Sequence, residues 1–299
     1  MIATHVNEIT AKTEKSGITF NVTYSTQNPS TDTIAIDEHG HILRDKNNRL
    51  LFRQAGHGTL LKNLNDLQAD VVFIKNIDNV LPDKLKPETC RYKKILGGVL
   101  VKVQRECFRL LNQLNEFSSD EKTISCIADW GRQTLSLTFP KGFKDYSASE
   151  RARFLYSKLN RPTRVCGMVK KSESLGGGPF WVEHNDGTQS LQIVETTQIN
   201  LTMPNQRIAL EESTHFNPVD IVCGLRDHRG IAFELSKFSD NTASIVTSKP
   251  YKEKTVRILE HPGLWNGGMK NWNTIFVEVP HITFSPVKTI LDLLRHEHQ

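Results

Sequence analysis

The sequence of 299 residues is long enough to bury a large core, and its 37% hydrophobic and 24% charged residues are ordinary for a folded globular protein. No apolar run approaches the roughly 20 residues that a membrane span needs, and the first residues lack the apolar segment of a secretory signal. A net charge of +5 without any block of Lys and Arg argues against nucleic acid as a partner and suits a small anionic substrate. Five scattered cysteines without a Cys-X-X-Cys pair indicate reduced thiols, so the cytoplasm is the expected location.

The first half of the chain predicts strands that alternate with helices. Residues 18–24 alternate like a half-buried strand, and a short strand is expected at 33–36. The segment 50–67 has the pattern of a strand, a glycine turn and a helix. A continuous apolar run at 71–74 is typical of a central parallel strand buried on both faces, and the spacing of apolar residues predicts a helix over 87–117. This order favours an α/β fold with a mainly parallel sheet flanked by helices.

The second half is richer in predicted strands. Residues 118–160 are more polar and are interpreted as an insertion, with a strand at 134–139 and a short helix that begins near Ser149. Further strands are predicted at 164–169, 178–183, 191–195, 219–225 and 274–279. A final helix is expected at 287–295, because Pro286 is a good residue for a helix entry. The chain is therefore interpreted as one α/β domain, residues 1–299, with an insertion at 118–160.

Asp78 and Asn79 lie in the polar stretch 75–79 that follows the apolar strand expected at 71–74. Ligands of open α/β sheets bind outside the carboxyl ends of the strands, so Asp78 is well placed to hold a metal ion. Mg²⁺ binds through one or two carboxylates together with substrate phosphates. A simple tight turn explains the same two residues, and the local pattern leaves both interpretations open.

Gly56, His57 and Gly58 precede a predicted helix, where free N–H groups and the positive end of the helix dipole attract anions. His57 is able to donate a hydrogen bond to a phosphate oxygen, although an ordinary glycine turn is the commoner explanation. Lys288 lies near the start of the last predicted helix, where a lone cation opposes the dipole and hints at an anionic partner. A solvated surface lysine is again the commoner explanation.

Two stretches rich in turn-forming and polar residues, 176–179 and 214–218, are candidates for a sugar pocket. Asparagine suits sugar hydroxyl groups because its amide both donates and accepts hydrogen bonds. Each stretch is equally well explained as a loop between strands.

Five stretches, taken in order, resemble the UTP-glucose-1-phosphate uridylyltransferase family, also called UDP-sugar pyrophosphorylases. The stretches are FRQAGHGTL, FIKNIDNVLPD, KKSESLGGGPF, SLQIVETTQIN and VPHITFSPVKTILDLL. The whole chain also resembles a bacterial family known as domain of unknown function 4301. The first resemblance implies a nucleotide-diphospho-sugar transferase (GT-A-like) architecture. It also implies transfer of a nucleotidyl group from a nucleoside triphosphate, UTP being favoured, to a sugar 1-phosphate with release of pyrophosphate.

The resemblance also implies roles for individual residues. The implied nucleotide contacts are Gly56, His57, Gly58 and Asn79. The implied sugar contacts are Gly177, Gly178, Glu195 and Asn217. The implied catalytic residues are Lys288, His57 and Asp78, with Asp78 also as the Mg²⁺ ligand.

The sequence departs from the pyrophosphorylase pattern in three places. No glycine-rich phosphate loop precedes Ile18, Thr59 stands where an acidic residue is expected, and a longer Asn-rich cluster is reduced to the tripeptide at 217–219. We therefore expect an N-terminally truncated form of that architecture, without its first strand and loop. The alternative function is a noncatalytic protein that binds a nucleotide or a nucleotide sugar.

Overall fold

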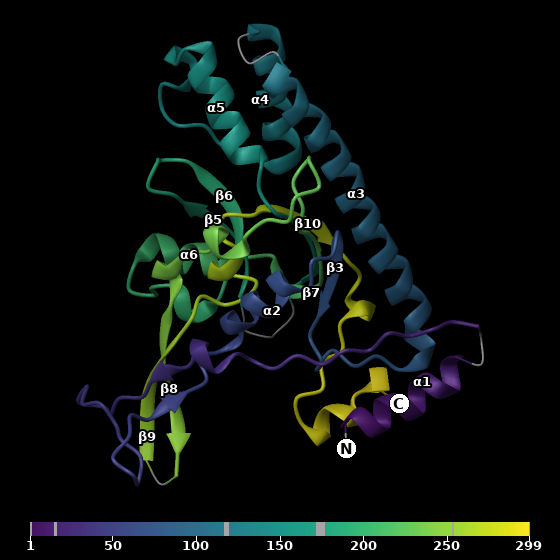
Figure 1. Cartoon of the computed structure of the whole chain (residues 1–299), viewed down its shortest axis with the longest axis vertical. Coiled ribbons are helices and arrows are strands. Elements are labelled where there is room, and N and C mark those ends of the chain that lie inside the picture. The colour runs from purple at the N-terminus through teal and green to yellow at the C-terminus, as the bar shows by residue number, and fades with distance from the viewer. Residues whose placement is uncertain (1, 15–16, 117–119, 172–176, 253, 299) are drawn as a thin grey trace.

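The computed structural model describes residues 2–14, 17–116, 120–171, 177–252 and 254–298. Its centre is a four-stranded sheet with the strand order β10 (Asn273–Glu278), β4 (Thr163–Lys170), β7 (His215–Gly224) and β3 (Val71–Lys75). β10 and β4 are parallel, whereas β7 is antiparallel to both β4 and β3. The expected α/β class is confirmed (Figure 1), but the sheet is mixed: within the described residues three strands share one direction and β7 opposes them.

Strand β4 is the buried centre of this sheet, and its residues 163–169 are all buried. Helix α3 (Lys86–Glu116) covers one face of the sheet, and helix α2 (Leu60–Asp66) packs on the other together with residues 264–272. The prediction of a central parallel strand at 71–74 is wrong. β3 lies at the edge of the described sheet and pairs antiparallel, with Val71 and Phe73 37% and 50% exposed. A short apolar run does not by itself state how many neighbours its strand has.

Helix α3 is 31 residues long and spans from the sheet to a helical end of the molecule (Figure 1). Near its start Leu96 and Leu100 pack on the sheet, and its later turns pack with α4 (Glu121–Leu135) and α5 (Ala148–Leu159) around a separate apolar cluster. The helix predicted at 87–117 is thus confirmed. It is rich in charged residues, and none of the helices that the structure describes is long and apolar enough to cross a membrane.

The region 118–160 consists largely of α4 and α5. The helix expected near Ser149 is confirmed, because Ser147 and Glu150 form a capping box at the start of α5. The strand expected at 134–139 is wrong: α4 continues to Leu135, and Ser136 ends it in a left-handed conformation. The apolar positions of this segment follow the helix instead of alternating along a strand.

Within the described part of the chain, three antiparallel pairs of strands lie outside the central sheet. They are β1 (Thr33–Ile34) with β2 (Phe52–Arg53), β5 (Gly178–Glu183) with β6 (Gln189–Val194), and β8 (Ile245–Tyr251) with β9 (Lys254–Glu260). The strands predicted from residue 164 onward are confirmed with shifts at their ends, and so is the strand, turn and helix pattern at 50–67. The polar β8–β9 hairpin and helix α6 (Pro204–Glu211) were not predicted.

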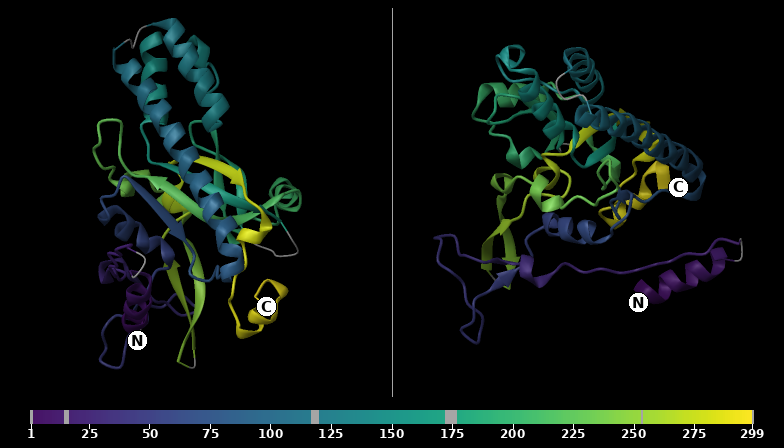
Figure 2. Two further views of the ribbon diagram at one scale, coloured as in Figure 1. Left: turned by 90° about the vertical axis from the view of Figure 1, so that its right-hand side faces the viewer. Right: turned by 45° about the horizontal axis from the view of Figure 1, so that its top comes forward.

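The two ends of the chain differ from expectation. Helix α1 (Ile2–Glu14) has no buried residue, and the segment after it runs along the outside of the molecule (Figure 2). The strand predicted at 18–24 is wrong, since this segment is exposed and pairs with none of the described strands. Near the other end, the predicted helix at 287–295 is only a 3₁₀ helix, Ile290–Leu294, that begins after Thr289.

Candidate functional site

The Gly56, His57 and Gly58 turn packs tightly against the end of β9. Gly56 has φ +76°, and a Cβ atom there would lie 2.5 Å from Oε2 of Glu260. A Cβ atom on Gly58 would lie 2.1 Å from the carbonyl oxygen of Pro262. Both glycines are therefore required by contacts within the chain itself, whatever ligand approaches the turn.

The imidazole of His57 is held in one orientation. Its Nδ1 accepts the backbone N–H of Leu264 at 3.0 Å, and its ring stacks on Trp265 with 4.5 Å between centroids. The Trp265 indole N–H in turn donates to Glu195 at 3.3 Å. Because Nδ1 accepts a hydrogen bond, the neutral ring carries its proton on Nε2. His57 is thus a fixed hydrogen-bond donor.

Two carboxylates surround this histidine. Burial lowers the pKa of His57, and the negative charges of Glu195 and Glu260 oppose that shift only in part. Burial alone would raise the pKa of Glu260, but hydrogen bonds from Lys249 at 2.6 Å and Thr247 at 2.8 Å outweigh it and keep the pKa low. The site therefore combines a neutral imidazole with the ionised carboxylate of Glu260, an arrangement better suited to hydroxyl groups than to a bare phosphate.

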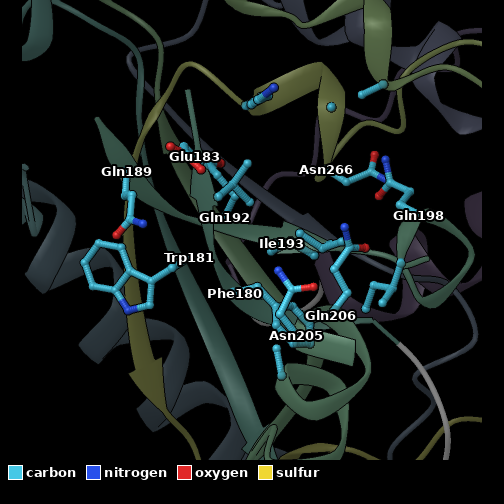
Figure 3. A pocket seen from close by; sticks show the side chains of 17 residues that line it. Phe180, Trp181, Glu183, Gln189, Gln192, Ile193, Gln198, Asn205, Gln206 and Asn266 are labelled. Carbon is cyan, nitrogen blue, oxygen red and sulfur yellow. The ribbon is translucent and has the colours of Figure 1, made fainter. Parts of the chain in front are cut away.

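Two adjoining cavities open beside this cluster. The first, here called the His57 pocket, has a volume of about 200 Å³ and is lined by His57, Glu195, Thr197, Ala243, Ile245, Glu260, His261, Gly263 and Asn266. The second, here called the amide pocket, has a volume of about 450 Å³ and lies between the β5–β6 hairpin, α6 and residues 266–270. Ala243 and Asn266 line both, so the cavities are neighbours. Figure 3 shows the amide pocket.

Arg164 supports both pockets from the core of the sheet. Its guanidinium group is fully buried and donates to Thr274, to the carbonyl oxygen of Trp265 and to Gln192. Burial lowers the pKa of Arg164. Among the described residues it makes no ion pair with a carboxylate, so neutral acceptors alone stabilise its charge. One side chain on β4 thereby connects three segments: strand β10, strand β6 and the loop that carries Trp265.

A second group of candidates lies after β3. The amide of the buried Asn79 donates to the carbonyl of Thr283 at 3.0 Å and accepts from the N–H of Ser285 at 2.8 Å. The carbonyl of Asp78 accepts the N–H of Val287 at 2.7 Å, which brings Asp78 beside the segment that carries Lys288. The carboxylate of Asp78 and the exposed ammonium of Lys288 make no hydrogen bond or ion pair with any described residue. Both are therefore available to a ligand, whereas the amide of Asn79 is already occupied.

Three lysines gather near the same end of β3, and we call them the lysine cluster: Lys75, Lys86 and Lys93. Lys75 on β3 lies opposite Asp220 on β7, and the ammonium of Lys93 on α3 contacts the buried carboxylate of Asp220. Burial lowers the pKa of Lys75; Asp220 opposes this shift, while the charges of Lys93 and Lys86 add to it. Lys86 pairs with the exposed Asp83. The cluster thus holds more positive than negative charge.

The sequence profile described as "Domain of unknown function (DUF4301)" matches residues 1–299. The chain belongs to the DUF4301 family. No curated protein matches this DUF4301 sequence. Among solved structures it is similar to a variant of UDP-glucose pyrophosphorylase from Leishmania major in complex with UDP-glucose, at 14% identity and a TM-score of 0.41, over 90% of this chain and 47% of that one. A uridine diphosphate N-acetylglucosamine pyrophosphorylase from Trypanosoma brucei gives 14% identity and a TM-score of 0.43, over 96% of this chain and 48% of that one.

The DUF4301 chain spans about half the length of these two solved structures. Its predicted site residues fall into two groups according to their contacts. His57 and Glu195 line the His57 pocket, with Gly56 and Gly58 on either side of His57 in the chain, whereas Asp78 and Asn79 lie beside the segment that carries Lys288. No hydrogen bond, ion pair or ring contact between described residues joins His57 to Asp78 or Lys288.

The remaining sugar candidates of the DUF4301 chain lie near the start of β5 and in β7. A Cβ atom on Gly178 would lie 2.7 Å from the carbonyl oxygen of His215, so this glycine serves the close approach of β5 and β7. Gly177 precedes it and is buried. Asn217 lies within β7, and its side chain is outside the described part of the structure.

Several residues of these sites were not predicted, namely Arg164, Trp265, Glu260, Asn266 and the lysine cluster. None of these positions carries a local sequence signal for a site, and only the packing of distant segments brings each of them to one. Asp78, the predicted Mg²⁺ ligand, has no cluster of further metal ligands around it. The described residues contain no group of three or more His, Cys, Asp or Glu able to hold a metal ion. The unpaired Asp78 carboxylate fits an ion that takes one protein ligand and completes its shell with phosphates and water.

Proposed function

We propose that this DUF4301 chain is a nucleotidyltransferase that joins a nucleoside triphosphate, with UTP preferred, to a sugar 1-phosphate and releases pyrophosphate. The observation that carries the proposal is that His57, in the Gly56 to Gly58 turn, and Glu195 line one pocket. These two residues are far apart in sequence, and the resemblance to pyrophosphorylases implies a nucleotide contact for His57 and a sugar contact for Glu195. A GT-A-like architecture is part of the proposal, and a mixed sheet with one reversed strand is compatible with it.

In this proposal the two groups of site residues bind different parts of the substrates. Glu195 and the Nε2–H of His57 contact hydroxyl or carbonyl groups, because both side chains are held in place and offer an acceptor and a donor. Lys288 and the lysine cluster attract the phosphates. Asp78 supplies the carboxylate for a Mg²⁺ ion, which when bound would neutralise charge on the phosphates.

The transfer needs no covalent intermediate on the protein. An oxygen of the sugar phosphate attacks the α-phosphorus of the triphosphate, the bond between this phosphorus and the bridging oxygen breaks, and pyrophosphate leaves with the electron pair. The protein's task is to align the two substrates and to offset the charge of the leaving group. Free thiols at all five cysteines fit the proposed cytoplasmic setting.

The second candidate is a noncatalytic protein that binds a nucleotide or a nucleotide sugar. It is favoured by one observation, namely that neither Asp78 nor Lys288 lines the His57 pocket, and no hydrogen bond or ion pair between described residues links either to His57. A protein that binds without reacting has no need to bring these groups together.

One experiment separates the two candidates. The chain is mixed with each nucleoside triphosphate, Mg²⁺ and a panel of sugar 1-phosphates, and released pyrophosphate is measured together with the melting temperature. Transfer predicts pyrophosphate release that falls at least about tenfold in Lys288→Met and Asp78→Asn. The control variant Lys46→Met, which changes another exposed lysine, should retain full activity. Stabilisation by a nucleotide sugar without pyrophosphate release indicates the binding protein. The absence of both effects contradicts both candidates.

A further inference from the structure

The amide pocket has an unusual lining. Side chains of six carboxamides face it: Gln189, Gln192, Gln198, Asn205, Gln206 and Asn266. Figure 3 shows Trp181 and Gln189 on one side of this space, Asn266 and Gln198 on the opposite side, and Asn205 and Gln206 between them. A carboxamide both donates and accepts hydrogen bonds without carrying charge. The lining therefore matches a ligand that carries many uncharged groups able both to donate and to accept hydrogen bonds.

Some of these amides already have partners. Gln192 is buried and accepts from Arg164 at 2.9 Å, and Gln206 accepts the N–H of Asn200 at 2.7 Å. The side chains of Gln189 and Asn205 are exposed and make no hydrogen bond with any described residue. These two are free to meet a ligand.

Asn266 provides an independent observation. It is only 6% exposed, and its amide N–H donates to Gln198 at 3.1 Å. Its Oδ1 is buried and accepts no hydrogen bond from any described residue. A buried acceptor without a donor is unfavourable and needs water or a ligand group to satisfy it. Asn266 lines both cavities, so such a donor is expected where they adjoin.

The charges of this pocket exclude a phosphate site. Its only charged lining residues are Glu183 and Lys270, and the ammonium of Lys270 already forms an ion pair with Asp240. Trp181 is 52% exposed at the wall of the pocket and lies opposite Leu191 in the β5–β6 hairpin. A half-exposed indole beside uncharged amides offers a flat apolar surface edged by hydrogen-bonding groups.

We propose that the amide pocket binds a neutral carbohydrate, a hexose or a short oligosaccharide without phosphate. Sugar hydroxyl groups donate and accept in the same way as carboxamides, and the C–H face of a pyranose ring packs on an indole. The volume of about 450 Å³ falls within the usual range for small-molecule sites. Gly177, Gly178, Glu195 and Asn217 do not line this pocket, so the site is separate from the sugar contacts implied by resemblance. The proposal holds whether or not the chain transfers nucleotides.

The test uses the whole chain and neutral sugars only: glucose, galactose, mannose, N-acetylglucosamine, maltose and cellobiose. Binding is followed by saturation-transfer NMR and by calorimetry, without nucleotide or phosphate. At least one sugar is expected to bind, and Trp181→Ala should weaken it about tenfold. Gln189→Ala and Asn205→Ala should each weaken it about threefold. The control Tyr24→Ala removes an aromatic side chain of similar exposure, 57%, outside the pocket and should leave binding unchanged.

Three results would overturn the assignment. The first is no binding of any of these sugars at tens of millimolar. The second is binding that neither Trp181→Ala nor Gln189→Ala weakens, which places the sugar elsewhere. The third is a Trp181-dependent complex with uridine or another nucleoside in place of sugars. Should Trp181→Ala lower the melting temperature, Gln189→Ala decides the outcome, because its exposed side chain has no partner among the described residues. A negative pyrophosphate assay does not bear on any of these readouts.

Discussion

The pockets beside His57 and the lysine cluster after β3 are both polar, but they differ in how their positive charges are balanced by carboxylates. Around His57 and in the amide pocket, each nearby lysine is paired with a carboxylate of its own, as Lys249 is with Glu260 and Lys270 with Asp240. In the lysine cluster the one buried carboxylate, Asp220, faces Lys75 and Lys93 together. A molecule with a neutral sugar part and an anionic phosphate part would find suitable partners in both regions.

The largest expected effect concerns Arg164, which supports the neutral region. Arg164→Ala removes the hydrogen bonds to Thr274, Trp265, Met269 and Gln192 and leaves a cavity, so we expect the free energy of unfolding to fall by about 3–5 kcal/mol. Urea denaturation measures this value. The exposed Arg153→Ala should change stability by no more than about 0.5 kcal/mol. A loss below about 1 kcal/mol for Arg164→Ala would show that the pocket walls hold without it.

Arg164 also shows how far sequence reasoning reaches. The strand that carries it was predicted, because β-branched residues at 163–169 make a local signal. The burial of the arginine was not predictable, since it follows from acceptors on β6, β10 and the Trp265 loop, which are distant in sequence. Helix α3 was predictable for the same local reason as the strand.

The errors have a common cause. Residues 18–24 and 71–74 both have strand patterns, but such a pattern does not determine which other strand the segment pairs with. The first segment pairs with no described strand, and the second lies at an edge of the sheet. The lysine cluster was missed because Lys75 and Asp220 become neighbours only through the pairing of β3 with β7. The resemblance implied separate nucleotide and sugar roles for His57 and Glu195, but nothing local to either segment implied that the two line one pocket.

The second expected effect tests the charged region. Lys75→Gln removes one positive charge, so the affinity for a nucleoside triphosphate should fall by about tenfold at low salt. Calorimetry at two salt concentrations measures the change, which should shrink as salt rises. Lys46→Gln serves as the control for an exposed lysine outside the cluster. If Lys75→Gln instead weakened the binding of neutral sugars, the assignment of phosphates to the lysine cluster and of sugars to the pockets beside His57 would be wrong.

A smaller effect is expected from the pH dependence of stability at His57. Its pKa in the folded protein lies below the ordinary value of 6.5, so the unfolded chain binds more protons at mildly acidic pH. The contribution of the neutral His57 side chain to the free energy of unfolding is complete above pH 6.5. It is lost as the pH falls from there through the lower pKa that His57 has in the folded protein. His57→Gln should therefore flatten this acid decline in unfolding free energy, whereas His39→Gln, at a side chain 72% exposed, should not. An equal acid decline in both variants would show that His57 does not contribute.

The smallest expected effect uses cysteines to compare local charge. Cys90, between Lys86 and Lys93 on α3, and Cys126 on α4 are exposed, whereas Cys107 and Cys166 are buried and burial raises the pKa of their thiols to about 12 and about 11. Native protein should therefore react at the two exposed thiols first. An anionic disulfide reagent should modify Cys90 about two- to threefold faster than Cys126 relative to a neutral maleimide, because nearby lysines concentrate anions. Pyrophosphate should remove this preference if the lysine cluster binds phosphates, and a preference that pyrophosphate leaves intact would place the anion site elsewhere.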